Sequence, residues 1–208
     1  MTTINFKVVL LGEGSVGKTS LVTRYVQNKF NEKHVTTIQA SFLSKRLNID
    51  GERINLAIWD TAGQERFHAL GPIYYRESNG ALLVYDITDN NSFIKVKNWV
   101  KELRSQLGKS VTLAIVGNKV DLEKQSRAVN EEEALEYAKS VGAEHYYTSA
   151  KLNKGIDELF LDLSRRMLAA AKAASSSSGI DTRQTQKSDR NLLIDFEESQ
   201  QDNSQCAC

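Results

Sequence analysis

Short apolar runs alternate with amphipathic stretches along most of the chain. The runs at residues 6–11, 81–85 and 111–116 are rich in Val and Leu, which is typical of strands buried on both faces of a sheet. Elsewhere apolar residues recur at helical spacing, which predicts amphipathic helices. These helices are expected at residues 19–27, at 92–107 after an N-cap at Asn91 or Ser92, at 131–141 after an N-cap at Asn130, and at 156–167. Strands that alternate with helices predict an α/β fold with a mostly parallel sheet.

One pair of strands is expected to be antiparallel. Residues 41–48 and 54–59 alternate apolar and polar side chains on either side of Asp50-Gly51. A type I′ turn needs positive φ at both central positions, so an Asp-Gly pair favours a β-hairpin here. With a last short strand at residues 145–147, the prediction is a mostly parallel six-stranded sheet with one antiparallel edge strand and helices on both faces.

A glycine-rich loop, Gly12 to Thr19, joins the first strand to the first helix and reads G-x-x-x-x-G-K-T. Glycines let backbone N–H groups surround an anion, and the start of the following helix adds unpaired amides. In such phosphate loops the lysine reaches the β- and γ-phosphates and the threonine hydroxyl holds Mg²⁺. The residues expected at the phosphates are Gly14, Ser15, Val16, Gly17, Lys18, Thr19 and Ser20. A chance match in a glycine-rich turn is the alternative, which the flanking strand and helix disfavour, so the predicted fold class is the three-layer α/β fold of P-loop NTPases.

Asp60-Thr61-Ala62-Gly63 follows the strand that ends at Trp59. Ligands of open parallel sheets lie outside the carboxyl ends of the strands, so this segment should meet the phosphate loop. Asp60 is then expected to hold Mg²⁺ through water opposite Thr19, and Gly63 to donate its N–H to the γ-phosphate. The D-x-x-G pattern is a weak signal alone and a strong one after a phosphate loop.

Asn118-Lys119-Val120-Asp121 follows another predicted strand. A carboxylate at Asp121 can accept two hydrogen bonds from the N1–H and N2–H₂ edge of guanine, which adenine cannot offer, so GTP is favoured over ATP. Asn118 is expected to brace the loop, and the stem of Lys119 to lie over the base. A polar turn that caps a helix is the alternative reading. Ser149-Ala150-Lys151 follows the last strand, where the N–H of Ala150 can meet guanine O6.

The composition of the 208 residues excludes some classes of protein. Lys plus Arg total 27 and Asp plus Glu total 26, a balance that does not favour nucleic acid. No apolar run approaches the roughly 18 residues that span a bilayer, and no signal peptide is visible, so we expect a cytosolic chain. From residue 173 onward the sequence is rich in Ser, Gln, Asp and Asn, which is typical of a disordered tail. The predicted division is therefore a folded domain at 1–172 and a tail at 173–208.

These four motifs, taken together, resemble those of the Ras superfamily of small GTPases. The resemblance extends to the Rab family over residues 6–170. It is carried by Ile38-Gln39-Ala40-Ser41-Phe42, Asn55-Leu56-Ala57-Ile58-Trp59, Arg66-Phe67-His68-Ala69-Leu70 and Tyr74-Tyr75-Arg76-Glu77-Ser78. The amino-acid sequence of residues 64–86 and 96–103 is similar to that of the early endosomal members of the family. In Ile38-Gln39-Ala40, glutamine follows the isoleucine where glycine would be typical of the family, which leaves the identity of the effectors open.

The resemblance implies roles for residues outside the four motifs. Thr37 would join Thr19 on Mg²⁺ only when a γ-phosphate is present, with Thr36 as a weaker candidate. Phe30 would lie against the guanine, and Gln64 would orient the attacking water as the catalytic residue. The residues that effectors would read are Ile38, Phe42, Trp59 and Tyr74. Core packing is the alternative for Phe30 and for the aromatic residues.

The chain ends in Cys206-Ala207-Cys208, its only cysteines. This ending resembles the Rab C-x-C signal for two geranylgeranyl groups, and two lipids anchor a protein stably where one does not. Two incidental thiols are the alternative. The resemblance further implies a monomer on the cytoplasmic face of intracellular membranes, with early endosomes expected. The implied partners are an exchange factor, a GTPase-activating protein, effectors, a prenylation escort and a GDP-dissociation inhibitor.

Three functions remain to be compared. The first is a GTP-hydrolysing switch in vesicle traffic, the second a guanine-nucleotide-binding module without significant hydrolysis, and the third a P-loop ATPase or nucleotide kinase. Gln64 and Thr37 favour the first over the second. Asp121 and the lack of an arginine-rich lid insertion disfavour the third.

Overall fold

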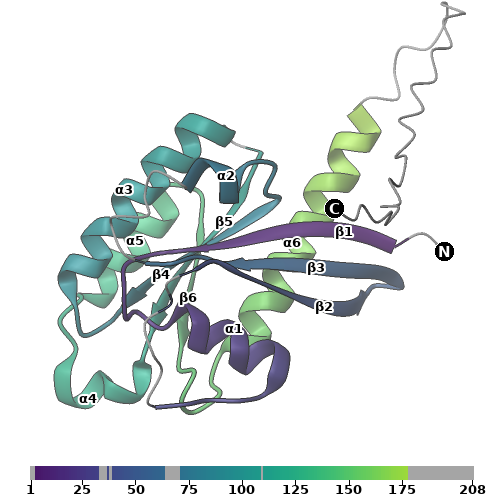
Figure 1. Cartoon of the computed structure of the whole chain (residues 1–208). Helices are drawn as coiled ribbons and strands as arrows, with labels where there is room; N and C mark the ends of the chain where they lie inside the picture. Colours follow the sequence, from purple (N-terminus) through teal and green to yellow (C-terminus); the bar gives the residue numbers. More distant parts are fainter. Residues whose placement is uncertain (1–2, 33–36, 38, 64–70, 109, 178–208) are drawn as a thin grey trace, which may run out of the picture.

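A computed structural model arranges the described residues in a single sheet flanked by helices (Figure 1). The described residues are 3–32, 37, 39–63, 71–108 and 110–177. The strands are β1 (Thr3–Leu11), β2 (Ser41–Ile49), β3 (Glu52–Asp60), β4 (Gly80–Asp86), β5 (Thr112–Asn118) and β6 (Glu144–Thr148). The helices are α1 (Lys18–Gln27), α2 (Gly71–Tyr75), α3 (Asn90–Leu107), the 3₁₀ helix η2 (Val120–Leu122), α4 (Glu123–Ser126), α5 (Glu131–Ser140) and α6 (Ile156–Ser177).

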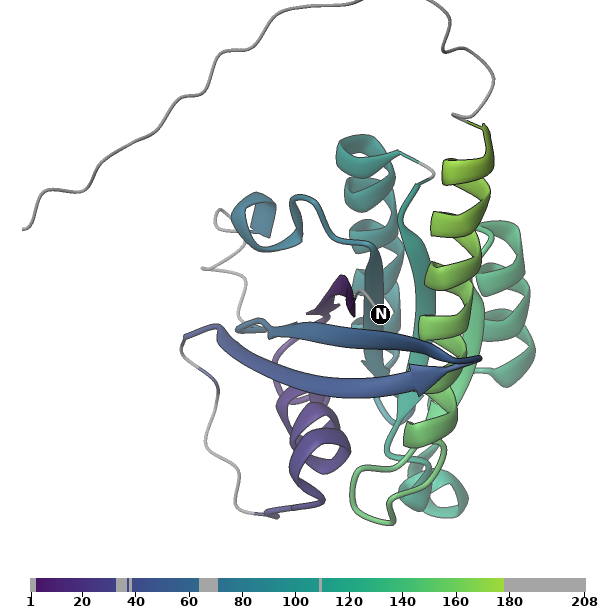
Figure 2. The ribbon, with the colours of Figure 1, turned by 90° about the vertical axis from the view of Figure 1, so that its right-hand side faces the viewer.

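The sheet has the predicted topology. Its strand order is β2-β3-β1-β4-β5-β6, and only the β2–β3 pair is antiparallel among the described strands. Figure 2 shows these two long strands, in blue, side by side. Asp50 and Gly51 between them have φ values of 52° and 83°, the positive values that a type I′ turn requires. The six-stranded sheet with one antiparallel edge strand is therefore confirmed.

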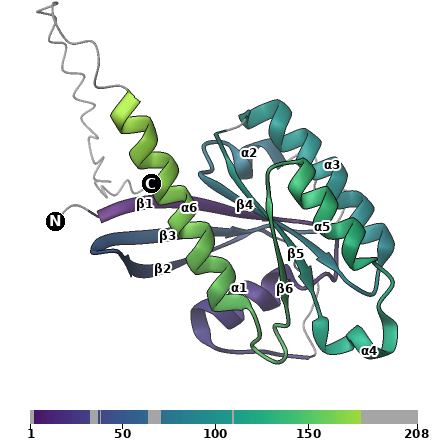
Figure 3. The same ribbon diagram turned by 180° about the vertical axis from the view of Figure 1, so that it is seen from behind.

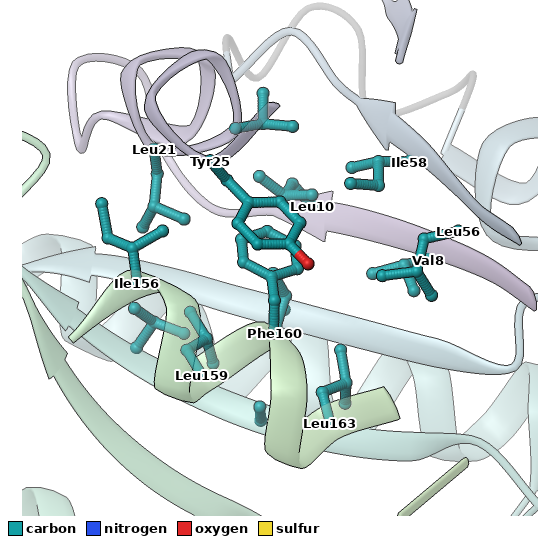
Figure 4. Packing of buried hydrophobic residues seen from close by; sticks show 14 of the residues in the cluster. Val8, Leu10, Leu21, Tyr25, Leu56, Ile58, Ile156, Leu159, Phe160 and Leu163 are labelled. Carbon is teal, nitrogen blue, oxygen red and sulfur yellow. The ribbon is translucent and has the colours of Figure 1, made fainter. Parts of the chain in front are cut away.

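Alternation along each strand divides the core into two layers. Val8 and Leu10 of β1 face α1 and α6, while Val9 and Leu11 face α3 and α5. Figure 4 shows the first layer, in which the ring of Tyr25 stacks on that of Phe160 with centroids 3.8 Å apart. The second layer lies under α3 and α5, which run side by side in Figures 1 and 3. The sheet and the helices packed on its two faces make the predicted three-layer α/β arrangement.

Two helix boundaries differ from the prediction. The N-cap of α3 is Asp89, whose carboxylate accepts from the N–H of Asn91 at 2.9 Å, and not Asn91 or Ser92. Ser92 is instead fully buried and its hydroxyl donates to the carbonyl of Asp89. The second difference is at the end of α6, which continues to Ser177, past the residue where the tail is predicted to begin. The rest of the tail, including Cys206 and Cys208, lies outside the described residues, and its role stays a prediction.

None of the helices in the described residues has both the length and the apolar character that crossing a bilayer requires.

Candidate functional site

The loops that follow β1, β3, β5 and β6, together with residues that follow α1, surround one cavity of about 260 Å³. It lies at the carboxyl edge of the sheet, as expected for an open parallel sheet. The predicted residues that line it are Gly14, Ser15, Gly17, Lys18, Thr19, Ser20, Phe30, Thr37, Gly63, Asn118, Lys119, Asp121, Ala150 and Lys151. Asn31, Glu32 and Thr61 also line the cavity and were not predicted. Segments as far apart in the sequence as the phosphate loop and Lys151 are thus brought to one space.

Lys18 provides a buried positive charge at one end of this cavity. Its side chain is buried at the start of α1, and Nζ donates to the carbonyls of Gly12 and Glu13 at 2.7 and 2.8 Å. Burial lowers the pKa of Lys18 to about 8, although the nearby carboxylates of Asp60 and Glu13 oppose that shift. A buried cation is costly unless an anion compensates it, so this end of the cavity favours phosphate.

Glycines allow the loops to close around Lys18. Gly17 has a φ of 94°, and a Cβ on it would lie 2.5 Å from Nδ2 of Asn118. A Cβ on Gly63 would lie 2.4 Å from the carbonyl oxygen of Glu13 and 2.5 Å from Nζ of Lys18. Both distances are shorter than side chains tolerate, so larger residues would force the phosphate loop away from its neighbours.

Three oxygen-bearing side chains converge beside Lys18. The hydroxyls of Thr19 and Thr37 are 2.6 Å apart, and the Thr19 hydroxyl donates to the carboxylate of Asp60 at 2.5 Å. Asp60 is fully buried at the end of β3, where it pairs in register with Leu10 of β1. Hydroxyl and carboxylate oxygens are the ligands that Mg²⁺ prefers. The residues present therefore fit a magnesium ion whose remaining ligands would be water and phosphate oxygens.

Asn118 ties the other end of the cavity to the phosphate loop. Its side chain is buried, Nδ2 donates to the carbonyl of Val16 at 2.9 Å, and Oδ1 accepts from the hydroxyl of Thr148 at 3.1 Å. The loops after β1, β5 and β6 are therefore held together by one amide. Val16 itself does not line the cavity, because its side chain is buried in the core beneath the loop.

Asp121 is fixed by the loop after β6. Its Oδ1 accepts a hydrogen bond from the hydroxyl of Ser149 at 2.6 Å, and that hydroxyl accepts from the N–H of Leu152 at 3.0 Å. Ser149 is fully buried and does not line the cavity. Ser149 therefore orients the carboxylate of Asp121 without itself lining the cavity.

Lys119 is held by a carboxylate that sequence reasoning gave no role. Its Nζ lies 2.6 Å from Oδ2 of Asp86, at the end of β4, and its backbone has a φ of 70°. Oδ1 of Asp86 accepts from the backbone N–H and hydroxyl of Thr88. This ion pair fixes the end of the Lys119 side chain, and Lys119 is one of the residues that line the cavity.

An aromatic cluster is formed by residues of β2, β3 and α2 that do not line the cavity. Phe42 and Trp59 face each other across the two strands with ring centroids 5.6 Å apart, and Tyr74 lies 6.2 Å from Trp59. Phe42 is 56% exposed, so core packing does not explain it. The other predicted residues, Thr36, Ile38 and Gln64, lie outside the described residues.

Comparisons with known proteins assign the chain to a family. The model of the Ras family matches residues 7–169, and the chain therefore belongs to the Ras family of small GTPases. Within that family it is similar to the Ras-related protein Rab-21 of Homo sapiens, with 64% identity over 98% of this chain and 90% of that protein. The Rab-21 proteins of Geodia cydonium and Dictyostelium discoideum are 70% and 59% identical over 81% and 98% of this chain, and over 73% and 96% of their own lengths.

These similarities establish a class of activity. The chain is a Rab-type GTPase that binds guanine nucleotide, hydrolyses GTP and acts as a switch in vesicle traffic. Proteins of this kind work with regulators and effectors. The ATPase and non-hydrolysing readings are accordingly disfavoured.

Proposed function

We propose that the cavity binds GTP with Mg²⁺, with the phosphates at the Lys18 end and guanine at the Asp121 end. The observation that carries this proposal is that one cavity holds both kinds of group. The buried cation of Lys18 lies beside the converging oxygens of Thr19, Thr37 and Asp60, and the carboxylate of Asp121, which is fixed by Ser149, lines the same cavity.

At the phosphate end, backbone N–H groups from Gly14 to Ser20 and from Gly63 would receive the phosphate oxygens. Thr19 and Thr37 would hold Mg²⁺ through their hydroxyls, and Asp60 would hold it through water. When bound, the ion neutralises charge that develops on the β- and γ-phosphates. Gln64 would orient the attacking water, a role that rests on the family resemblance.

At the guanine end, Asp121 would accept from N1–H and the 2-amino group, while the N–H of Ala150 would donate to O6. The Ser149 hydroxyl donates to Oδ1 of Asp121 and thereby limits rotation of the carboxylate. Phe30, Lys119 and Lys151 line the same end and would enclose the base. A site built to pair with this edge rejects adenine, since the carboxylate would be left unpaired.

The switch itself would follow from loss of the γ-phosphate. Thr37 and Gly63 belong to different loops and would share that phosphate as a partner, so hydrolysis would release both loops. Phe42 and Trp59 lie on the adjoining hairpin and Tyr74 lies on α2, and effectors would read the change there together with Ile38. Hydrolysis is expected to be slow without a GTPase-activating protein, because the described residues that line the cavity do not include an arginine.

We further propose that the protein cycles between the cytosol and early endosomal membranes. The relatives named Rab-21 and the C-x-C ending support this site of action. Cys206 and Cys208 would carry geranylgeranyl groups added with the help of an escort, and a GDP-dissociation inhibitor would extract the GDP form. An exchange factor would reload it.

The decisive experiment measures nucleotide preference and turnover on one protein sample. Displacement of a fluorescent GDP by GTP, GDP and ATP, each with and without Mg²⁺, should rank the guanine nucleotides far above ATP. Single-turnover hydrolysis of bound GTP should then be slow and accelerated by a Rab-directed activating protein. Equal displacement by ATP would refute the base site, and the absence of hydrolysis with the activating protein would refute the catalytic assignment.

A further inference from the structure

Arg24 on α1 donates hydrogen bonds both to the end of its own helix and to a distant loop. Its Nε donates to the carbonyl of Ala150 at 2.9 Å, and its Nη2 donates to the carbonyl of Lys151 at 3.4 Å. Its Nη1 donates to the carbonyl of Asn28 at 3.1 Å and lies 3.3 Å from Oδ1 of the same residue. One guanidinium thus joins the end of its own helix to a loop 126 residues later in the chain.

The guanidinium also lies against the other wall of the cavity. Its central carbon is 5.8 Å from the centroid of the Phe30 ring, a distance typical of a cation–π contact. Phe30 follows Asn28 by two residues, and Asn28 ends α1 in the left-handed conformation with its N–H bonded to the carbonyl of Arg24. Phe30, Ala150 and Lys151 all line the cavity, whereas Arg24 does not. Arg24 therefore lies behind the two walls between which guanine is proposed to bind.

We propose that Arg24 is a positioning residue for the guanine subsite, setting how long nucleotide stays bound and how strictly its base is selected. The proposal rests on the base site assigned above. Arg24 does not line the cavity itself; it would hold the Ala150-Lys151 backbone and the Phe30 ring at a fixed separation. A planar guanidinium suits this task because its donors point in fixed directions to several carbonyls at once.

The expected effect on base selectivity follows from the hydrogen bond between Ser149 and Asp121. Ser149 precedes Ala150 and donates to Asp121, the carboxylate that would read the 2-amino group of guanine. When Arg24 no longer holds Ala150 and Lys151, the Ser149 loop gains freedom and the Asp121 carboxylate loses its fixed orientation. Loss of Arg24 should therefore weaken guanine recognition more than it weakens phosphate binding.

Helix capping is the simpler explanation of the contact with Asn28, since arginine four residues before a helix end commonly bonds the last carbonyls. That explanation accounts for Nη1 alone. It leaves the donations to Ala150 and Lys151 unexplained, and those two contacts are the ones that would affect the nucleotide.

The structure supplies a matched control in Arg104 on α3. Its Nη1 donates to the carbonyls of Gly108 and Val111, both at 3.2 Å, and its Nη2 donates to that of Val141 at 3.1 Å. Arg104 thus caps its helix and joins it to distant backbone in the same manner, but its partners do not line the cavity. Arg24→Ala and Arg104→Ala remove equivalent contacts, and only the first removes contacts to the base loop.

The experiment measures dissociation of GDP and inosine diphosphate at saturating Mg²⁺ from the wild type, Arg24→Ala, Arg24→Lys and Arg104→Ala. Inosine lacks the 2-amino group that Asp121 would bind. Arg24→Ala should release GDP on the order of tenfold faster, as expected for loss of charge-assisted hydrogen bonds. Its preference for GDP over inosine diphosphate should shrink as well. Arg24→Lys, which keeps the charge but has its N–H donors on a single nitrogen, should recover part of both effects, and Arg104→Ala should change neither.

Release of GDP from Arg24→Ala within twofold of the Arg104→Ala rate would overturn the proposal, as would an unchanged preference between the two nucleotides. Asp121→Asn is measured in parallel. If it alters the preference while Arg24→Ala does not, only the role of Arg24 is refuted; if it leaves guanine binding unchanged, the base site itself is refuted.

Discussion

The hydroxyl of Thr19 donates a hydrogen bond to the carboxylate of Asp60 over 2.5 Å, joining the first turn of α1 to the end of β3. The two residues are 41 positions apart in the sequence. They meet because β1 and β3 are neighbouring parallel strands whose carboxyl ends lie at one edge. The position of the proposed magnesium site therefore follows from sheet topology before any ligand is considered.

Replacing Thr19 by Asn should weaken binding of Mg²⁺–GTP more than binding of GDP. The proposed metal loses a hydroxyl ligand, and the triphosphate depends on the ion more strongly because its charge is larger. Titration of both nucleotides at fixed Mg²⁺ should show a GTP-to-GDP affinity ratio lower by roughly tenfold. Ser20→Ala, which alters a neighbouring hydroxyl that is not a proposed ligand, should leave the ratio near that of the wild type. Equal losses for GTP and GDP would contradict the metal assignment.

Replacing Asp121 by Asn should move the preference from guanine toward xanthine nucleotides. An amide can donate to the 2-oxo group of xanthine, whereas it meets the 2-amino group of guanine with the wrong polarity. Competition between xanthosine and guanosine diphosphates measures the change. Ser149→Ala serves as a comparison: it removes the donor that fixes Asp121 and should weaken guanine binding without favouring xanthine. Unchanged guanine affinity in Asp121→Asn would remove this residue from the base site.

Replacing Glu32 by Gln should speed nucleotide release slightly and make it less sensitive to salt. Glu32 and Lys151 pair at 2.8 Å, and both line the cavity. The pair is largely exposed, so its effect should stay within about fivefold and fade as salt rises. GDP release from wild type and variant is compared at low and high ionic strength. Glu123→Gln, in an ion pair with Arg127 away from the cavity, is the control. A difference between wild type and Glu32→Gln that persists at high salt would contradict an electrostatic role.

Patterns of apolar residues predicted the fold because each strand and helix is buried on the faces that its period presents. Val8 and Val9 point to opposite layers, as alternation requires, and the stripe on α6 places Phe160 against Tyr25. The end of α6 was less predictable. A serine tract is typical of linkers, yet the hydroxyls of Ser175 and Ser176 donate to the carbonyl of Lys172 within the helix.

Residues at strand ends were predictable for a similar reason. Asp60 and Asn118 are the last residues of their strands, and such positions in a parallel sheet share one edge. Arg24 and Glu32 gave no such signal. Each looks like an ordinary charged residue in sequence, and its partner lies more than a hundred positions away. Asp86 directly follows the strand predicted at residues 81–85, so its contact with Lys119 could have been expected from the same rule.

The buried ring of His145 gives a prediction about stability at mildly acidic pH. His145 bonds to the hydroxyl of Tyr85 at 2.9 Å and lies against Tyr147. Burial, assisted by the positive charge of Arg127, lowers the pKa of His145 to about 4. Glu131 acts electrostatically on Tyr85, the hydrogen-bond partner of His145.

Because the unfolded chain has the higher histidine pKa, near 6.5, it binds the proton first as the pH falls. The free energy of unfolding should therefore decrease between about pH 6.5 and 4, by up to about 1.4 kcal/mol per pH unit from this residue. Urea denaturation at a series of pH values measures that slope. His145→Gln, which keeps an acceptor for Tyr85, should flatten the slope in this window. His34→Gln is the comparison variant, at a histidine outside the described residues. An identical slope in wild type and His145→Gln would show that His145 does not set the acid sensitivity.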